Sequence, residues 1–97
     1  MSILHTVNSS PFQTLALQQC LAILGEQDSL LLIEDGVVAC QAKHADFLAL
    51  SELAKQGQLM VLEADLQARG ISARIGKSCS YLQFVELVAG HKSQMAW

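Results

Sequence analysis

One short run of residues constrains the fold of this chain more than any other. Residues 29–33 read SLLLI, with four apolar residues and no charge, and Glu34, Asp35 and Gly36 end the run abruptly. A continuous apolar run of this length is typical of a strand that is covered on both faces, as in the centre of a parallel sheet. The run therefore predicts an α/β protein.

Strand-like and helix-like patterns alternate along the rest of the chain. We expect strands over residues 2–7, 29–33 and 58–65, a short one within 71–80 and a last one at 93–97; helices are expected over 11–24, 42–57, 64–70 and 80–92. Short connections between alternating elements favour right-handed crossovers. The sequence predicts one domain, residues 1–97, folded as a three-layer sandwich with a mostly parallel sheet of about five strands.

Some helix details also follow from local residue types. Ser9 or Ser10 is expected to cap the first helix, with Pro11 in its first turn. Asp65 is expected to cap the helix at 64–70. In the last helix, the apolar spacing predicts an inward face made of Leu82, Val85, Val88 and Ala89.

The composition is unusually apolar for a chain of this length. Apolar residues make up 52% and charged residues only 15% of the 97 positions, against about 45–50% and 25% in ordinary domains. A domain of this size buries roughly 60–65% of its chain surface, so part of the apolar excess is expected outside. Contiguous apolar surface usually marks a partner, and we expect an obligate subunit rather than a free monomer.

Charge and cysteine usage exclude several classes of function. The net charge is −3 and the six basic residues are scattered, so direct nucleic-acid binding is not expected. Neither a signal peptide nor a membrane span is visible, and three cysteines without a CxxC pair indicate reduced thiols. These features predict a cytoplasmic protein. No phosphate-binding loop is present, so no nucleotide or other cofactor is expected.

Each of the three cysteines has two interpretations. Cys20 has only apolar neighbours at helical spacing and lies late in its helix, which favours a buried core thiol over a sulfur carrier. Cys40 follows the end of a strand, where sites of parallel sheets gather, but Glu34 and Asp35 would raise its pKa. Cys79 has Lys77 nearby, and the positive charge of this lysine would assist a thiolate. We assign no catalytic residue, and Cys20 is kept as the candidate sulfur-handling thiol.

Histidines and carboxylates give no stronger site. Cys40 and His44 stand four residues apart, but zinc normally takes three or four ligands, so no metal site is expected. His5 is expected to be partly buried and hydrogen-bonded, and His91 to cap the end of the last helix. The acidic pairs after two strands are expected to end strands and cap helices rather than do acid–base chemistry: Glu34 with Asp35, and Glu63 with Asp65.

The last residues raise a separate question, because the only tryptophan of the chain is Trp97. In an extended conformation Met95 and Trp97 point the same way. Tryptophan is enriched among the anchors of protein interfaces, so we predict that Met95 and Trp97 contact a partner subunit. The alternative is that Trp97 folds back over its own domain.

Four segments carry a resemblance to a known family. Residues 2–12 (SILHTVNSSPF), 30–37 (LLLIEDGV), 61–70 (VLEADLQARG) and 91–97 (HKSQMAW) together resemble the TusB/DsrH family of sulfur-relay proteins. The resemblance implies a small Rossmann-like subunit of the DsrE/DsrF/DsrH-like fold. The amino-terminal block, taken together with Cys20 in the first predicted helix, is similar to DsrH, where a cysteine occurs at this place. The tail, residues 91–97, is similar to TusB.

The resemblance also implies partners and a pathway. TusB proteins assemble with TusC and TusD as a dimer of heterotrimers, which accepts persulfide sulfur from TusA and passes it to TusE for 2-thiolation of the tRNA wobble uridine. The essential cysteine belongs to the TusD or DsrE subunit. We therefore expect a mainly structural, non-catalytic subunit of a sulfurtransferase complex. The alternatives are a DsrH-type subunit of a dissimilatory sulfur-oxidation complex, in which Cys20 handles sulfur, and a stand-alone homo-oligomer that binds a partner or a small ligand.

Overall fold

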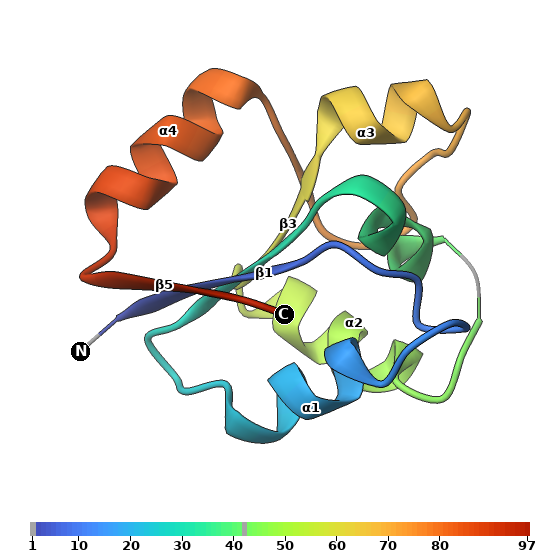
Figure 1. Cartoon of the computed structure of the whole chain (residues 1–97), viewed down its shortest axis with the longest axis horizontal. Helices are drawn as coiled ribbons and strands as arrows, with labels where there is room; N and C mark the ends of the chain where they lie inside the picture. Colours follow the sequence, from blue (N-terminus) through green and yellow to red (C-terminus); the bar gives the residue numbers. More distant parts are fainter. Residues whose placement is uncertain (1, 42) are drawn as a thin grey trace.

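The computed structural model describes residues 2–41 and 43–97, which form a five-stranded sheet flanked by helices (Figure 1). The strands are β1 (Ile3–Val7), β2 (Ser29–Leu32), β3 (Leu59–Leu62), β4 (Lys77–Cys79) and β5 (Ser93–Ala96). They lie in the order β4-β3-β2-β1-β5, and all neighbouring strands pair in parallel. The predicted α/β sandwich with five strands is confirmed, and the SLLLI run supplies its central strand.

The order of the strands explains where the helices lie. The helices are α1 (Ala16–Ile23), α2 (Phe47–Lys55), α3 (Glu63–Ala68) and α4 (Tyr81–Gly90). The chain moves in one direction from β1 to β4 and then returns across the sheet to β5. Because right-handed crossovers in opposite directions place their helices on opposite faces, α1 and α2 lie on one face and α4 on the other (Figure 1). We call these the first face and the second face.

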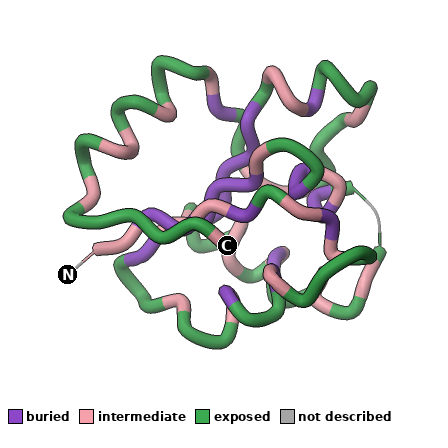
Figure 2. Tube along the Cα trace, in the orientation of Figure 1, coloured by how far each residue is buried: buried purple, intermediate pink, exposed green. Residues whose placement is uncertain are grey.

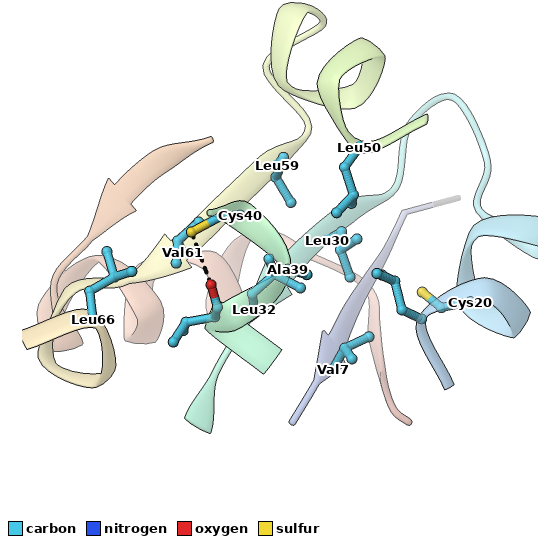
Figure 3. Packing of buried hydrophobic residues seen from close by; sticks show 12 residues of the cluster. Val7, Cys20, Leu30, Leu32, Ala39, Cys40, Leu50, Leu59, Val61 and Leu66 are labelled. Atoms are coloured by element: carbon cyan, nitrogen blue, oxygen red, sulfur yellow. Dashed lines mark hydrogen bonds between the residues drawn. The ribbon is translucent and has the colours of Figure 1, made fainter. Parts of the chain in front are cut away.

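The two faces carry separate hydrophobic clusters. Leu30 and Leu32 of β2 point to the first face and Leu31 to the second, which is why three leucines follow one another without a polar residue between them. The first-face cluster is large (Figure 3) and consists of Val7, Leu17, Cys20, Leu30, Leu32, Val37, Ala39, Cys40, Leu50, Leu59, Val61 and Leu66. The second-face cluster has four buried members, Leu4, Leu31, Met60 and Cys79. Only half-buried side chains of α4 and Ile33 pack against it.

Two helices begin later than predicted. The hydroxyl of Ser10 accepts a hydrogen bond from the amide of Phe12, and its carbonyl accepts from Gln13 and Thr14. These bonds close a separate turn, so α1 begins only at Ala16 and the serine capping prediction is wrong. The second predicted helix, residues 42–57, begins at Phe47 instead; residue 42 lies outside the described part of the chain.

A short 3₁₀ helix, η1 (Glu34–Cys40), was not predicted. It packs against the end of β1 so closely that a Cβ at Gly36 would lie 2.2 Å from the carbonyl oxygen of Val7. Only glycine permits this approach. The sequence shows the glycine but not the contact that requires it, because that contact joins segments far apart in the chain.

Two further predictions about helices are wrong. Asp65 does not cap α3, because the helix begins at Glu63, directly after β3. In α4, Leu82 and Val85 point to solvent, with 70% and 63% of their side chains exposed, and Ala89 is exposed as well. The half-buried residues of α4 are Phe84, Leu87 and Val88, so Val88 is the one member of the predicted inward face that is confirmed. A single helix on a sheet buries one stripe, and the second apolar stripe of α4 is left outside.

Candidate functional site

The first candidate site is the Cys20 thiol, which lies inside the first-face cluster. Its exposed fraction is 0%, and Figure 3 shows the sulfur among apolar side chains of the sheet and helices. Burial raises the pKa of the Cys20 thiol to about 12, and the charge of Asp28 adds to the rise. A thiol with this pKa is neutral at physiological pH, whereas a sulfur carrier reacts as a thiolate.

The other two cysteines are buried as well. Cys40 ends η1 rather than facing the carboxyl edge of the sheet, and its sulfur donates to the carbonyl oxygen of Val37 at 3.0 Å. Burial raises the pKa of Cys40, so burial, rather than the neighbouring acids, is the main cause. Cys79 ends β4, where burial raises its pKa although Lys77 acts in the opposite direction. None of the three has the environment of an activated nucleophile.

A cavity of about 330 Å³ lies beside Cys79, between the second face and α4. Its lining is mixed, with apolar side chains from Met60 and Leu87 and polar groups from Lys77, Glu86 and His91. Both ring nitrogens of His91 are hydrogen-bonded within the protein. Nδ1 donates to the carbonyl oxygen of Leu87 at 2.7 Å, and Nε2 bonds the Ser29 hydroxyl at 3.0 Å. The predicted capping role of His91 is thereby confirmed.

The carboxyl edge of the sheet, where α/β proteins usually build their sites, is closed by an ion-pair network. The Asp65 carboxylate accepts from the amide of Glu34 at 2.7 Å, while the Arg69 guanidinium bonds Asp35 at 3.0 Å and lies 3.6 Å from Asp65. These bonds tie η1 to α3. The carboxylates therefore hold backbone segments together, and their geometry offers no acid–base pair.

Cys40 and His44, four positions apart in sequence, do not lie on one helix, because η1 ends at Cys40. His44 Nε2 donates to the carbonyl oxygen of Ala39 at 2.9 Å, and its Nδ1 accepts from the amide of Asp46 at 3.2 Å. Both ring nitrogens are thus engaged. Within residues 2–41 and 43–97, no cluster of three or more histidines, cysteines or carboxylates could hold a metal ion.

At the chain end, Met95 and Trp97 lie on the same side of β5, as their alternation predicts. The Trp97 indole stacks on His5 and its Nε1 donates to His5 Nδ1 at 3.1 Å. Trp97 therefore folds over its own domain, while 41% of Met95 is exposed. His5 is buried and hydrogen-bonded, more deeply than predicted. The proposed partner contact of Met95 and Trp97 stays a prediction.

The most extended candidate site is an apolar surface on α4. No residue of this helix is buried, and Figure 2 shows most of it exposed. Tyr81, Leu82 and Val85 stand one and three positions apart and form a ridge on its outer side, with more than half of each side chain exposed. We call these three residues the α4 ridge. Each of the three is therefore available for contact with a partner.

Comparisons with known proteins show the family of the chain. The profile of the family described as "DsrH like protein" matches residues 9–94. Over 98 residues, which cover 98% of the chain and the whole relative, "Protein TusB" of Cronobacter sakazakii and of Erwinia tasmaniensis are each 38% identical. "Protein TusB" of Yersinia pestis is 37% identical over the same length.

The chain belongs to the TusB/DsrH family. This membership makes it a sulfur-relay family protein, and the resemblance found in the sequence is confirmed. In this TusB/DsrH protein, no described helix has the length and apolarity that crossing a bilayer requires.

The α4 ridge was not predicted from the sequence, because the apolar residues of this helix lie on more than one side of it. The helix reads YLQFVELVAG, and its apolar residues form two stripes, one with Leu82 and Val85 and one with Phe84, Leu87 and Val88. Only one stripe can face a sheet. The signal was therefore the excess of apolar residues around the whole helix of this TusB/DsrH protein, rather than the spacing of any one set.

Proposed function

We propose that this chain is a structural subunit of a cytoplasmic sulfur-relay complex that passes persulfide sulfur towards 2-thiolation of the tRNA wobble uridine. Its partners are TusC-like and TusD-like subunits in a dimer of heterotrimers, with a TusA-like donor and a TusE-like acceptor. The similarity to proteins named TusB over the whole chain supports this assignment.

The observation that carries the structural role is the state of the thiols. Cys20, Cys40 and Cys79 are all buried, and burial raises the pKa of each. Sulfur transfer needs an accessible thiolate that attacks the terminal sulfur of the donor persulfide. Since none of the three is poised for that step, the reacting cysteine of the complex belongs to a partner subunit.

The α4 ridge supports the assembly part of the proposal. A free domain rarely leaves a whole apolar helix stripe in water, and such stripes are typical of surfaces that a partner covers. The ridge carries Tyr81 beside two aliphatic side chains, and tyrosine is enriched among the residues that contribute most to binding. A partner subunit on the second face would complete the thin layer there.

Deletion of the gene in its host, followed by mass spectrometry of tRNA nucleosides, tests the function. We expect 2-thiolation of the wobble uridine to fall sharply and to return when the wild-type gene is supplied. Normal thiolation in the deletion strain would contradict the pathway.

Complementation with Cys20→Ala separates the structural role from the sulfur-carrying alternative. Alanine removes the thiol without adding a polar group to the core, so a structural subunit restores thiolation. A chain that accumulates normally but fails to restore it would assign sulfur handling to Cys20. Cys40→Ala serves as the matched control, because it changes the other thiol of the same cluster.

A further inference from the structure

The C-terminal indole is tied to the interior by a chain of two hydrogen bonds. Trp97 Nε1 donates to His5 Nδ1 at 3.1 Å, and His5 Nε2 lies 3.0 Å from the Asp28 carboxylate. His5 is fully buried in β1, and Asp28 is buried just before β2. These two hydrogen bonds therefore link Trp97 to β1 through His5, 92 positions away in sequence, and to the start of β2 through Asp28, 69 positions away.

The direction of these bonds assigns the protons. An indole N–H only donates, so His5 Nδ1 must offer a lone pair, and the single ring proton lies on Nε2, facing Asp28. The Asp28 carboxylate also accepts from the amides of Ile3 and Gly25, each at 3.0 Å. Although burial opposes ionisation, these bonds hold the pKa of Asp28 below its usual 3.8. Both hydrogen bonds, Trp97 to His5 and His5 to Asp28, form only when His5 is neutral and Asp28 is ionised.

We propose that the His5–Trp97 bond is a proton-sensitive clasp, which holds the C-terminal end of β5 on the sheet while His5 is neutral and releases the indole when His5 gains a proton. A proton on Nδ1 turns the acceptor into a donor, so two N–H groups face each other. The Asp28 carboxylate stabilises the resulting imidazolium. The indole, by contrast, loses its partner.

β5 lies at the edge of the sheet, where the His5 bond acts on its last residue. All four residues of the strand are exposed, and it pairs along its length with β1. Beyond the strand, the amide of Trp97 donates to the carbonyl oxygen of Thr6 at 2.9 Å, and the indole packs against the first-face cluster. Loss of the His5 bond therefore frees the indole N–H and loosens the exposed strand end, while the pairing with β1 keeps β5 in the sheet.

The other described groups that face His5 either keep their charge state near neutral pH or carry no charge. Asp28 contributes a carboxylate that stays ionised well below neutrality, and α1 contributes the Cys20 thiol, which stays neutral until about pH 12. The β5 strand places Met95 beside His5, and β2 places Leu30 there.

Trp97 is the only tryptophan, so its fluorescence and its indole N–H resonance report the clasp in the intact chain. On acidification from pH 8 we expect the emission to shift to the red and the indole N–H signal to lose its protection as His5 gains a proton, while far-UV circular dichroism stays constant. Nitrogen-15 shifts of the His5 ring should show unprotonated Nδ1 at pH 8, and protonation should coincide with the indole change.

His5→Gln is the variant that isolates the proton. A glutamine amide can accept from the indole through its oxygen and donate to Asp28 through its nitrogen, and it does not titrate. The pH-dependent shift should be lost in His5→Gln and unchanged in His44→Gln, which alters a histidine outside the clasp. If His5→Gln does not fold, the wild-type ring shifts decide alone.

Two results would overturn the clasp: an indole signal that does not follow His5 protonation, or one that changes only together with global unfolding. The measurement uses the isolated chain and does not rest on the proposed function. Its failure would leave the sulfur-relay assignment untouched, and a failed thiolation assay would leave the clasp untouched.

Discussion

The two faces of the sheet are covered very differently. On the first face, α1 and α2 enclose a cluster of twelve buried residues, and Leu50 and Leu30 have no exposed surface at all. On the second face, α4 alone covers four buried residues and contributes no buried residue itself. The same central strand supplies leucines to both. The difference therefore comes from how many helices the crossovers place on each side, not from the strand.

Because of this asymmetry, we expect the first face to contribute most of the stability of the fold and the second face to offer the surface for a partner. The first face has the dense packing in which lost atoms leave cavities and cost free energy. The second face keeps apolar side chains half-covered and presents the α4 ridge to the outside. In a family of sulfur-relay proteins, a thinly covered face is the part of the chain that gains most from a partner. Four predictions, the first with two measurements, test this division, from the largest expected effect to the smallest.

The largest contrast concerns thiol reactivity on the first face. With a pKa of about 12 against an ordinary value of 9.0, the thiolate fraction of Cys20 at pH 8 falls by about a thousandfold relative to an unfolded chain. Alkylation with iodoacetamide, followed site by site by mass spectrometry, should be slower by at least that factor in the native chain. Cys79, on the second face, should be less protected, because Lys77 favours its thiolate.

The same pKa shift makes stability depend on pH at the alkaline end. The folded state holds the Cys20 proton more tightly than the unfolded state, so its contribution is complete below pH 9.0 and declines as pH rises towards about 12. Urea unfolding from pH 8 to 10.5 should show this decline, and Cys20→Ala should reduce it. An equal slope in both chains would show that Cys20 is accessible.

The second prediction concerns packing. Leu50→Ala removes a side chain of α2 that is fully buried on the first face, and we expect the free energy of unfolding to fall by about 3 kcal/mol. Leu48→Ala, in the same helix but 80% exposed, should change it by less than about 0.5 kcal/mol. A small effect of Leu50→Ala would mean that the first face is not the main core.

The third prediction concerns association and rests on the proposed function. Leu82→Asp places a charge on the α4 ridge, and we expect the affinity for the partner subunits to fall at least tenfold, or about 1.4 kcal/mol. The stability of the isolated chain should stay the same, since Leu82 is mostly exposed. Leu48→Asp is the matched control for an exposed helix leucine, and co-purification with both partners provides the measurement. Equal binding by the two variants would remove the ridge from the interface.

The smallest effect is expected under α4 itself. Leu87→Ala truncates a half-buried side chain that lines the cavity on the second face, so we expect a loss of only about 1 kcal/mol in the isolated chain. Chemical unfolding with and without the partners checks this value. A loss as large as that of Leu50→Ala would show that both faces are packed alike and would end the comparison.

Much of this fold could be predicted from short stretches of sequence. The SLLLI run, the glycine-terminated helices and the alternation of elements were sufficient for a five-stranded parallel sheet, because period and termination are local properties. The burial of Cys20 followed from the apolar neighbours on its own helix turn. The late start of α1 was missed because the Ser10 turn satisfies backbone groups in a way that competes with a helix.

The sequence by itself determined that the chain has an α/β fold, that it has more apolar surface than it can bury, and that Cys20 has only apolar neighbours at helical spacing. Only the tertiary structure decided which stripe of α4 faces outward, that η1 packs on β1 through Gly36, and that Trp97 finds its acceptor in His5. The physical reason is distance along the chain. Periodicity and capping depend on neighbours within a few residues, whereas these contacts form between segments that only the crossovers of the sheet bring together.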